Sequence, residues 1–352
     1  MPGNSIFHIV RLNHTETFLR GRVRVAGNIL SACLITLISR RTQYNTSNPK
    51  DLTPCIQSPG DNIAAFKGYK REQHMNIGIV TDSTCDLPAE IVSRYGITIV
   101  PLHINIGDKT FLDGVDLSRE EFYAQLPGYN PAPKTAAPGP EIFQEAYNRL
   151  ADKGMQAVLS IHISESLSAT VNSARIAAEQ FTRIPVTVLD SSQLSLGLGF
   201  IVEKAAQLAG LDHKMEDILS NLRELMKRTY VFASLKTLEY LRRSGRMHFT
   251  LARFGELLQI KPLLHMNQGN PTPYRARTQS KATARLLEWV AEYAPYERLA
   301  IVHAGVPQEA KAMLEKIRDF LPSGDIPIVQ ITPVLGAHLG IGALGFACIS
   351  KE

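Results

Sequence analysis

The sequence contains few cysteines and no apolar run long enough to cross a bilayer. A membrane-spanning helix needs about 18 or more consecutive apolar residues, whereas the run Ile29–Ile38 is short and includes Ser31 and Thr36. The spacing of the four cysteines matches neither a metal site nor a disulfide framework. A reducing compartment is the simplest explanation, so we expect a cytoplasmic protein. The cysteines are Cys33, Cys55, Cys85 and Cys348.

Motifs for nucleotide or metal chemistry are also missing. The chain has no G-x-x-x-x-G-K-[ST] phosphate loop, no cluster of Cys and His for a metal, and no G-x-S-x-G nucleophile elbow. Gly340, Gly342 and Gly345 match the spacing of a dinucleotide-binding loop, but too few residues follow to supply the helix and second strand of that fold. We therefore expect neither a metal nor a cofactor. A catalytic set of Ser, His and Asp stays open.

The positive charge is concentrated at the start of the chain. The 352 residues carry a net charge of +5, and residues 1–74 hold ten Lys and Arg against four Asp and Glu. The remainder is therefore close to neutral, which offers no electrostatic footprint for a nucleic acid. At Met75 the pattern changes to M-N-I-G-I-V-T-D-S-T, a methionine, a polar residue and then a buried strand. We expect residues 1–74 to be a disordered extension or a mis-assigned start.

From Met75 onward, short apolar runs alternate with amphipathic ones, which predicts an α/β fold. Beyond about residue 212 this alternation is lost. We predict an N-terminal α/β domain over 75–228, with a mainly parallel sheet and flanking helices, and a C-terminal α+β domain over 229–352. The predicted strands are Ile77–Thr81, Thr98–Ile104, Ala157–Ile163, Val186–Leu189, Val231–Leu235, Ile260–His265, Leu299–His303, Ile326–Ile331 and Ala343–Ile349.

Two of the predicted helices have marked ends. Ser118 precedes the helix Arg119–Leu126, and Glu121 follows three residues later, which is the pattern of a capping box. A second helix, Glu141–Lys153, has Pro140 at its first turn and Gly154 past its end.

Polar turns follow several of the predicted strands. The richest is Ile163–Ala174, with five hydroxyl side chains and one acid between a strand and a helix. Ligands of an open α/β sheet bind at the carboxyl ends of its strands, where hydroxyl and backbone N–H groups can bind a carboxylate without a buried cation. Helix capping or a plain loop is the alternative for each turn taken alone. The other turns are Thr81–Pro88, Pro133–Pro140 and Asp190–Ser192.

Two basic segments and one histidine could meet an anion. The turn Leu241–Met247 carries Arg246 beside Gly245, and its arginines could bind a phosphate or an acidic partner, or simply lie at a solvated helix end. Arg275 and Arg277 alternate along the chain, so we expect them on one solvent-facing edge. His338 lies in a glycine-rich segment that we expect to be a loop, where it could donate to an anionic head group or be structural.

These pieces, in this order, resemble the DegV family of bacterial fatty-acid-binding proteins. The resemblance runs from Met75 to the end of the chain, and it implies a two-domain α/β protein with a long-chain fatty acid between the domains. The motifs that carry it include T-D-S-T-C-D-L at 81–87, F-L-D-G-V-D at 111–116, I-S-E-S-L-S-A-T-V-N-S-A at 163–174, Y-L-R-R-S-G-R at 240–246, Y-R-A-R-T at 274–278 and H-L-G-I-G at 338–342.

The resemblance also implies roles for individual residues. Thr135, Ser168 and His338 would bind the fatty-acid carboxylate. Arg246 would lie near the head group, where an acyl phosphate forms, and Arg277 would belong to the surface that meets a kinase partner. In that system the protein carries the fatty acid, and a separate ATP-binding subunit of a fatty-acid kinase phosphorylates it. The carrier then needs no catalytic residue of its own, and a transient contact with a membrane surface is compatible with its role.

The sequence departs from the family pattern near the expected head-group site. Ala136 and Ala137 replace polar residues after Thr135, and Ala169 replaces a glycine beside Ser168. We therefore expect the lipid to bind somewhat differently or the preferred acyl chain to differ. Two other functions remain as alternatives, namely a sensor of a small anion or lipid without a kinase partner, and a serine hydrolase that uses Ser168 with His338 as base.

Overall fold

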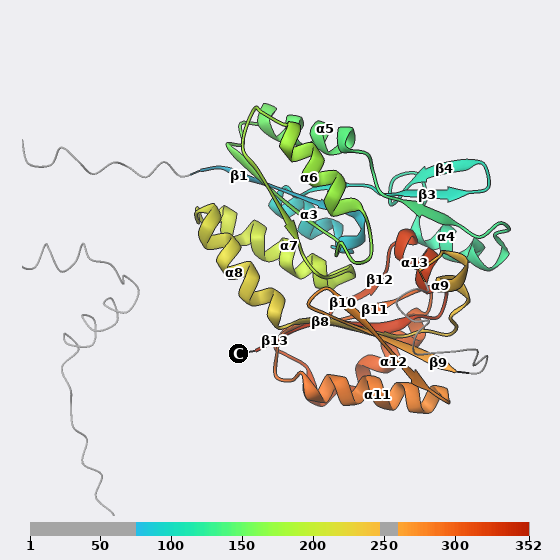
Figure 1. Ribbon diagram of the computed structural model, residues 1–352. Coiled ribbons are helices and arrows are strands. Elements are labelled where there is room, and N and C mark those ends of the chain that lie inside the picture. The colour runs from blue at the N-terminus through green and yellow to red at the C-terminus, as the bar shows by residue number, and fades with distance from the viewer. Residues whose placement is uncertain (1–74, 247–259, 352) are drawn as a thin grey trace, which may run out of the picture. The chain divides into compact units, whose positions relative to one another are not determined.

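The computed structural model describes residues 75–246 and 260–351, and the predictions for residues 1–74 lie outside this range. The described residues all lie within one compact unit. Its described strands form three sheets (Figure 1). The α/β fold predicted from the sequence is confirmed, whereas the domain boundary at 228/229 stays a prediction.

The first sheet is parallel, with the order β2 (Thr98–Val100), β1 (Ile77–Asp82), β6 (Ala157–His162) and β7 (Val186–Asp190). Every residue of β1 and β6 is buried, as expected where helices cover both faces of a sheet. On one face the sheet packs against α5 (Pro140–Asp152) and α6 (Thr170–Gln180). On the other face it packs against α7 (Ser195–Gly210), beside which lie α3 (Ala89–Tyr95) and α8 (Met215–Lys227) (Figure 1).

A small antiparallel sheet has the order β4 (Lys109–Leu112), β3 (His103–Ile106) and β5 (Lys134–Ala136). The prediction of one strand over Thr98–Ile104 is wrong, because Pro101 separates β2 from β3 and the two strands enter different sheets. Proline has no N–H for a sheet ladder, and the next N–H, that of Leu102, donates to the Ser83 hydroxyl instead.

The expected helix ends near this sheet are confirmed. Helix α4 (Arg119–Gln125) begins with the complete capping box of Ser118 and Glu121. Helix α5 has Pro140 in its first turn, and Gly154, beyond its last residue, has a φ of +84°.

The third sheet has the order β10 (Asn270–Ala276), β9 (Lys261–Asn267), β8 (Thr229–Ser234), β13 (Leu344–Ser350), β11 (Tyr296–His303) and β12 (Ile328–Gln330). Its strands are antiparallel except for the pair β11 and β12. On one face it packs against α11 (Gln279–Glu292) and α12 (Pro307–Lys316) around Trp289 and Phe346. Apolar residues on its other face belong to the same hydrophobic core as α7, the helix that packs on the first sheet. Strand β10 was not predicted, because it contains two prolines, which edge strands tolerate.

The glycine-rich segment near the end of the chain is partly helical. Residues Pro333–Leu339 form α13, so the expectation that His338 lies in a loop is wrong. Pro333 occupies the first helical turn, where the missing N–H has no cost. The helix ends at Gly340, whose φ is +76°, and a Cβ there would lie 2.0 Å from the Tyr240 ring of α9 (Glu239–Arg243). Glycine is required at this close contact, and His338 therefore occupies the last turn of a short, tightly packed helix.

Candidate functional site

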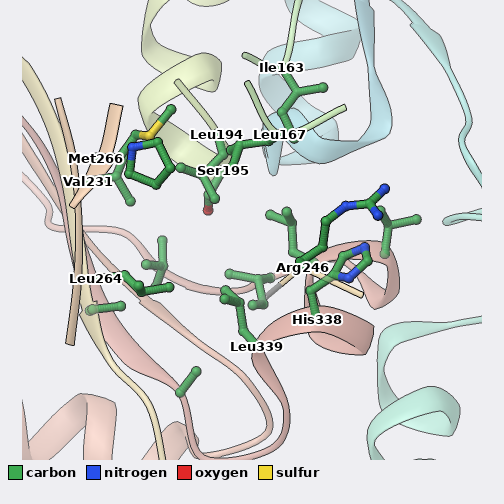
Figure 2. A pocket seen from close by; sticks show the side chains of 18 of the residues that line it. Ile163, Leu167, Leu194, Ser195, Val231, Arg246, Leu264, Met266, His338 and Leu339 are labelled. Atoms are coloured by element: carbon green, nitrogen blue, oxygen red, sulfur yellow. The ribbon is translucent and has the colours of Figure 1, made fainter. Parts of the chain in front are cut away.

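A pocket that is partly open to solvent lies between the ends of β6 and β7 and the inner face of the third sheet, and the empty space there is about 1150 Å³ with the adjoining solvent included. Figure 2 shows Leu167 and Leu194 at the top of the pocket, Leu264 at its left and His338 of α13 toward its right. The lining is mainly apolar, and its polar side chains are those of Thr135, Ser168, Ser195, Arg246, His265, His303 and His338. An apolar cavity with a few fixed polar groups suits a ligand with a long apolar body and a small polar head.

Thr135 and His338 form a direct hydrogen bond inside this pocket. Thr135 lies in β5 and His338 in the last turn of α13, and Oγ1 of the threonine is 2.8 Å from Nε2 of the histidine. Nδ1 of His338 is buried and has no hydrogen-bond partner among the described residues. Burial, with Arg246 nearby, lowers the pKa of His338 to about 4, so the imidazole is neutral at pH 7.

A neutral imidazole limits what this pair can offer to an anion. If the Thr135 hydroxyl donates to Nε2, the ring proton is on Nδ1 and can be donated. If Nε2–H donates to Thr135, the hydroxyl proton is free instead. In either arrangement the two side chains supply one proton in total to a bound carboxylate. Another donor or a cation is needed to complete the site.

Ser168 lies in the turn between β6 and α6 and also lines the pocket. Its Oγ is 2.8 Å from Oγ1 of Thr170 and accepts the Thr170 N–H at 3.4 Å. The hydroxyl therefore fixes the start of α6, as a polar turn at this place can do, while remaining at the pocket wall. Ala169 and Ala136 are both exposed, and neither lines the pocket. The structure therefore does not support the expectation that Ala136 and Ala169 change how the lipid head group binds.

Arg246 supplies a cation at the same end of the pocket as His338 (Figure 2). Among the described residues its guanidinium has no ion pair or hydrogen bond. Arg242 and Arg243 of the same basic segment both pair with Glu239, and their hydrogen bonds to it lower the pKa of that carboxyl to about 2. Of the arginines in this segment, only Arg246 reaches the pocket with its charge available.

Arg277 lies apart from the other predicted site residues. It follows the end of β10 at Ala276, it is exposed, and it does not line the pocket. Arg275 is exposed on the edge strand, so the expected solvent-facing edge is confirmed. The strand ends before Arg277, however, and strand alternation does not extend to it.

A buried polar chain beneath the Ser168 turn was not predicted. His162 Nδ1 lies 3.0 Å from Asp82 Oδ2, and His162 Nε2 lies 2.7 Å from Ser160 Oγ. These three side chains are fully buried in the first sheet and do not line the pocket, so they cannot act on a substrate there. Asp82 also accepts the Ile163 N–H at 2.9 Å, which fixes the start of the turn. The only signal in the sequence for this polar chain was the presence of polar residues within two otherwise apolar strands.

The geometry gives no support to a hydrolase that uses Ser168 and His338. Ser168 is bonded to Thr170 and His338 to Thr135, and no hydrogen bond joins the two proposed catalytic side chains. Within residues 75–246 and 260–351, no group of three or more His, Cys, Asp or Glu side chains is arranged to hold a metal ion. In the same residues, no helix has the length and apolar character needed to span a membrane.

The known proteins that this chain resembles, in sequence and in structure, are DegV proteins. Residues 76–351 match the model of the DegV family, described as uncharacterised proteins. A DegV domain-containing protein of Streptomyces coelicolor is 36% identical over 281 residues, which cover 78% of this chain and 99% of the relative.

Two solved structures resemble this chain along their whole length. The structure of DegV from Bacillus subtilis, described as a fatty acid binding protein, matches with a TM-score of 0.72 and 32% identity, over 79% of this chain and 100% of that one. A fatty-acid-binding DegV family protein from Thermus thermophilus matches with a TM-score of 0.71 and 33% identity, over the same shares.

Proposed function

The chain belongs to the DegV family, and on that premise we propose that it binds a long-chain fatty acid in the pocket between the first and third sheets. The observation that carries this proposal is one mainly apolar cavity that brings together Thr135, Ser168, Arg246 and His338. The fatty-acid-binding relatives from Bacillus subtilis and Thermus thermophilus share the fold over their full length, which adds support.

The energetics of such binding divide between the tail and the head of the lipid. Burial of about fifteen methylene groups at ~0.8 kcal/mol each gives on the order of 12 kcal/mol before the costs of association. The apolar lining therefore supplies most of the affinity. The polar groups decide which end of the lipid lies beside α13 and distinguish an acid from a neutral lipid of equal length.

We assign the carboxylate to the Thr135, Ser168 and His338 group. The Thr135–His338 pair donates one proton, Ser168 can donate a second by releasing Thr170, and Arg246 compensates the negative charge. A neutral His338 suits this role because it can donate from Nδ1, the buried atom that has no partner among the described residues. The lipid is the ligand, and neither a cofactor nor a metal is part of the proposal.

We further propose that the bound carboxylate is presented to a separate ATP-binding kinase subunit. A carboxylate oxygen would attack the γ-phosphorus of ATP, which forms an acyl phosphate and releases ADP. Arg246 would stabilise the added phosphate, and Arg277, exposed and outside the pocket, would contact the kinase. The family resemblance and the free charge of Arg246 support this step. A cytoplasmic location, where ATP is present, is part of the same proposal.

Reconstitution tests this function against its alternative. The lipid-loaded chain is incubated with ATP and a fatty-acid kinase subunit, and acyl phosphate is trapped with hydroxylamine and measured. The proposal predicts acyl phosphate only when all components are present. Lipid binding without any acyl phosphate would favour the lipid sensor, and absence of lipid binding would contradict both functions.

A further inference from the structure

Two buried carboxylates outside the pocket contact the segment that leads into α13. Asp86 and Asp113 are 1% and 2% exposed, and neither residue lines the pocket. Asp86 follows the first parallel strand, and Asp113 follows β4 of the small sheet. Both aspartates lie in the N-terminal half of the chain, whereas α13 lies near the C-terminus. The contact therefore joins segments that are distant in sequence.

Asp86 and Asp113 together hold the N-terminus of α13 through its N-cap residue. The Thr332 N–H donates to Asp86 Oδ1 at 2.8 Å, and the Thr332 hydroxyl donates to Asp113 Oδ2 at 2.8 Å. Thr332 is the N-cap residue of α13, yet its own side chain makes no capping bond, because its hydroxyl is committed to Asp113. Two distant carboxylates thus hold the residue at which α13 begins, where many helices have only a local side-chain cap.

Two side chains of α4 hold the same segment. Arg119 lies 3.4 Å from Asp86 and also donates to the Gln330 carbonyl. The Tyr123 hydroxyl donates to the Ile331 carbonyl at 3.2 Å. A Cβ at Gly336 would lie 2.4 Å from the Tyr123 oxygen, so α13 can approach α4 this closely only with glycine there. Figure 1 shows the two helices side by side.

These contacts fix a helix that cannot position itself. An isolated helix of seven residues is unstable in water, so α13 depends on its surroundings for its position. Four of its residues line the pocket, namely Val334, Leu335, His338 and Leu339. The helix is held at its start by the carboxylates and near its end by the hydrogen bond between His338 and Thr135. A shift at the capped end therefore moves the His338 ring relative to Thr135.

Asp86 also reaches the opposite wall of the pocket. The Ser195 hydroxyl donates to Asp86 Oδ2 at 2.6 Å, and Ser195 lines the pocket at the start of α7. Figure 2 places Ser195 on the side that faces His338 and Leu339. One carboxylate thus connects the start of α7 to the start of α13 and sets the distance between two walls.

The cluster of Asp86, Asp113 and Arg119 holds these elements together at a cost in desolvation free energy. Burial raises the pKa of Asp86 to about 7 and that of Asp113 to about 6, with Arg119 as the nearby cation. Buried ionic groups are often no more stabilising than well-packed apolar residues of similar volume, so stability alone explains the cluster poorly. Hydrogen bonds to named backbone groups do give a defined position, which apolar packing does less well.

From this geometry we propose that Asp86 and Asp113 are positioning residues for the lipid head group, which act by holding the N-cap residue of α13 and so fixing His338 against Thr135. The inference rests on the proposed fatty-acid function, because it assigns the cluster to the acid-binding end of that site. It adds residues that never touch the ligand but determine whether the pocket distinguishes a carboxylate from a neutral head.

The test compares Thr332→Val with Thr332→Ser in the full chain after removal of lipid. The valine variant loses the hydroxyl that donates to Asp113 and keeps the shape of the side chain, whereas serine keeps the hydroxyl. Affinities for palmitate and for hexadecanol, which has the same tail, are measured by titration. We expect Thr332→Val to bind palmitate about tenfold more weakly, with hexadecanol unchanged, because the polar contacts of the head are displaced. Thr332→Ser should match the wild type.

Asp113→Asn and the surface-cap variant Ser118→Ala complete the comparison. Asp113→Asn should lower the preference for palmitate as Thr332→Val does, whereas Ser118→Ala, which removes the cap of α4, should leave the preference unchanged. An unchanged ratio of palmitate to hexadecanol affinity in folded Thr332→Val would overturn the proposal. A general loss of both ligands would also overturn it, because that result indicates a structural role only.

An NMR readout separates failure of this inference from failure of the proposed function. The His338 ring resonances are followed with pH in the lipid-free wild type and in Thr332→Val. If the cap positions His338, its pKa rises in the variant from the low wild-type value, because the ring becomes better hydrated. If the wild type binds neither ligand, the proposed function fails, and an unchanged His338 titration then overturns the positioning role as well.

Discussion

Oγ1 of Thr135 lies 2.8 Å from Nε2 of His338, and this hydrogen bond joins β5 to the last turn of α13 inside the pocket. The bond is informative because His338 is neutral at pH 7, so the two side chains share a single transferable proton for a ligand. The proposed head-group site is therefore a coupled pair with Ser168 and Arg246 beside it, and the effects of substitutions in the pair should not be additive.

Thr135→Val should weaken fatty-acid binding, whereas Thr135→Ser should preserve it. The valine removes the hydroxyl that sets the His338 tautomer, and loss of one hydrogen bond to a charged group costs about 1.5–3 kcal/mol, which is roughly a tenfold to hundredfold loss of affinity. Titration of lipid-free protein with palmitate measures this. Thr110→Val, at an exposed threonine of β4, is the matched control. Equal affinity of Thr135→Val and wild type would remove the pair from the site.

Fatty-acid binding should raise the pKa of His338. In the lipid-free protein, burial and Arg246 hold this pKa at about 4, and a carboxylate beside the ring favours the charged form. His338 should therefore take up a proton on binding at pH values between about 4 and the pKa of the complex. NMR titration of the ring with and without palmitate measures the shift directly. A pKa that falls or stays constant on binding would place the carboxylate elsewhere.

Stability should fall as the pH rises from about 4 to about 7, in part because of Asp86. Its pKa is about 7 in the folded protein, against an ordinary value of 3.8, so the folded state holds a proton that the unfolded state has lost. The slope from one such group approaches about 1.4 kcal/mol per pH unit. Asp86 faces Asp113, Arg119 and the hydroxyl of Ser195, and these groups share the titration.

Urea unfolding at several pH values tests this dependence. Asp86→Asn should show a flatter stability profile between pH 4 and pH 7 than the wild type. Asp116→Asn, at an exposed carboxyl outside the cluster, should keep the wild-type profile. If both variants retain the full slope, Asp86 is not the group responsible.

Arg246→Ala should reduce acyl-phosphate formation more than lipid retention. The guanidinium has no partner among the described residues, so its charge is available for a phosphate that develops at the head group. Arg243→Ala is the control, because Arg243 is engaged with Glu239 outside the pocket. Lipid content by mass spectrometry and acyl phosphate by trapping are measured on the same samples. Equal loss of both quantities would contradict the assigned role.

Arg277→Glu should weaken engagement of the kinase subunit and leave bound lipid intact. Arg277 is exposed and outside the pocket, so reversal of its charge does not affect the cavity. Arg275→Glu reverses a charge two residues earlier on the edge strand and tests whether the effect is local. Phosphorylation rates at varied kinase concentration give the apparent affinity. Full-rate phosphorylation of Arg277→Glu at limiting kinase would exclude this residue from the interface.

Much of the fold was predictable because local signals agreed with the tertiary structure. The buried runs of β1 and β6 and the capping box at Ser118 each depend on residues close together in the chain. Prediction failed at Thr98–Ile104 and at β10, where prolines obscure the strand pattern. It failed again at α13, whose glycines are explained by close contacts with Tyr123 and Tyr240 rather than by a loop.

The candidate site could be predicted only in part from the sequence. The motifs pointed to Thr135, Ser168, Arg246 and His338, and the structure brings all four to one pocket. The Thr135–His338 bond, however, depends on the position of α13. That position depends on contacts of Thr332 with Asp86 and Asp113, which lie 246 and 219 residues away in the chain. No local pattern encodes such a contact.

Mass spectrometry of lipid extracted from the purified chain tests the central claim most directly. The account predicts long-chain fatty acid at close to one molecule per chain. It also predicts a large reduction in Leu167→Trp, which places a bulky side chain at the pocket wall. Purified wild-type protein that contains no fatty acid, and takes up none when palmitate is added, would contradict the account.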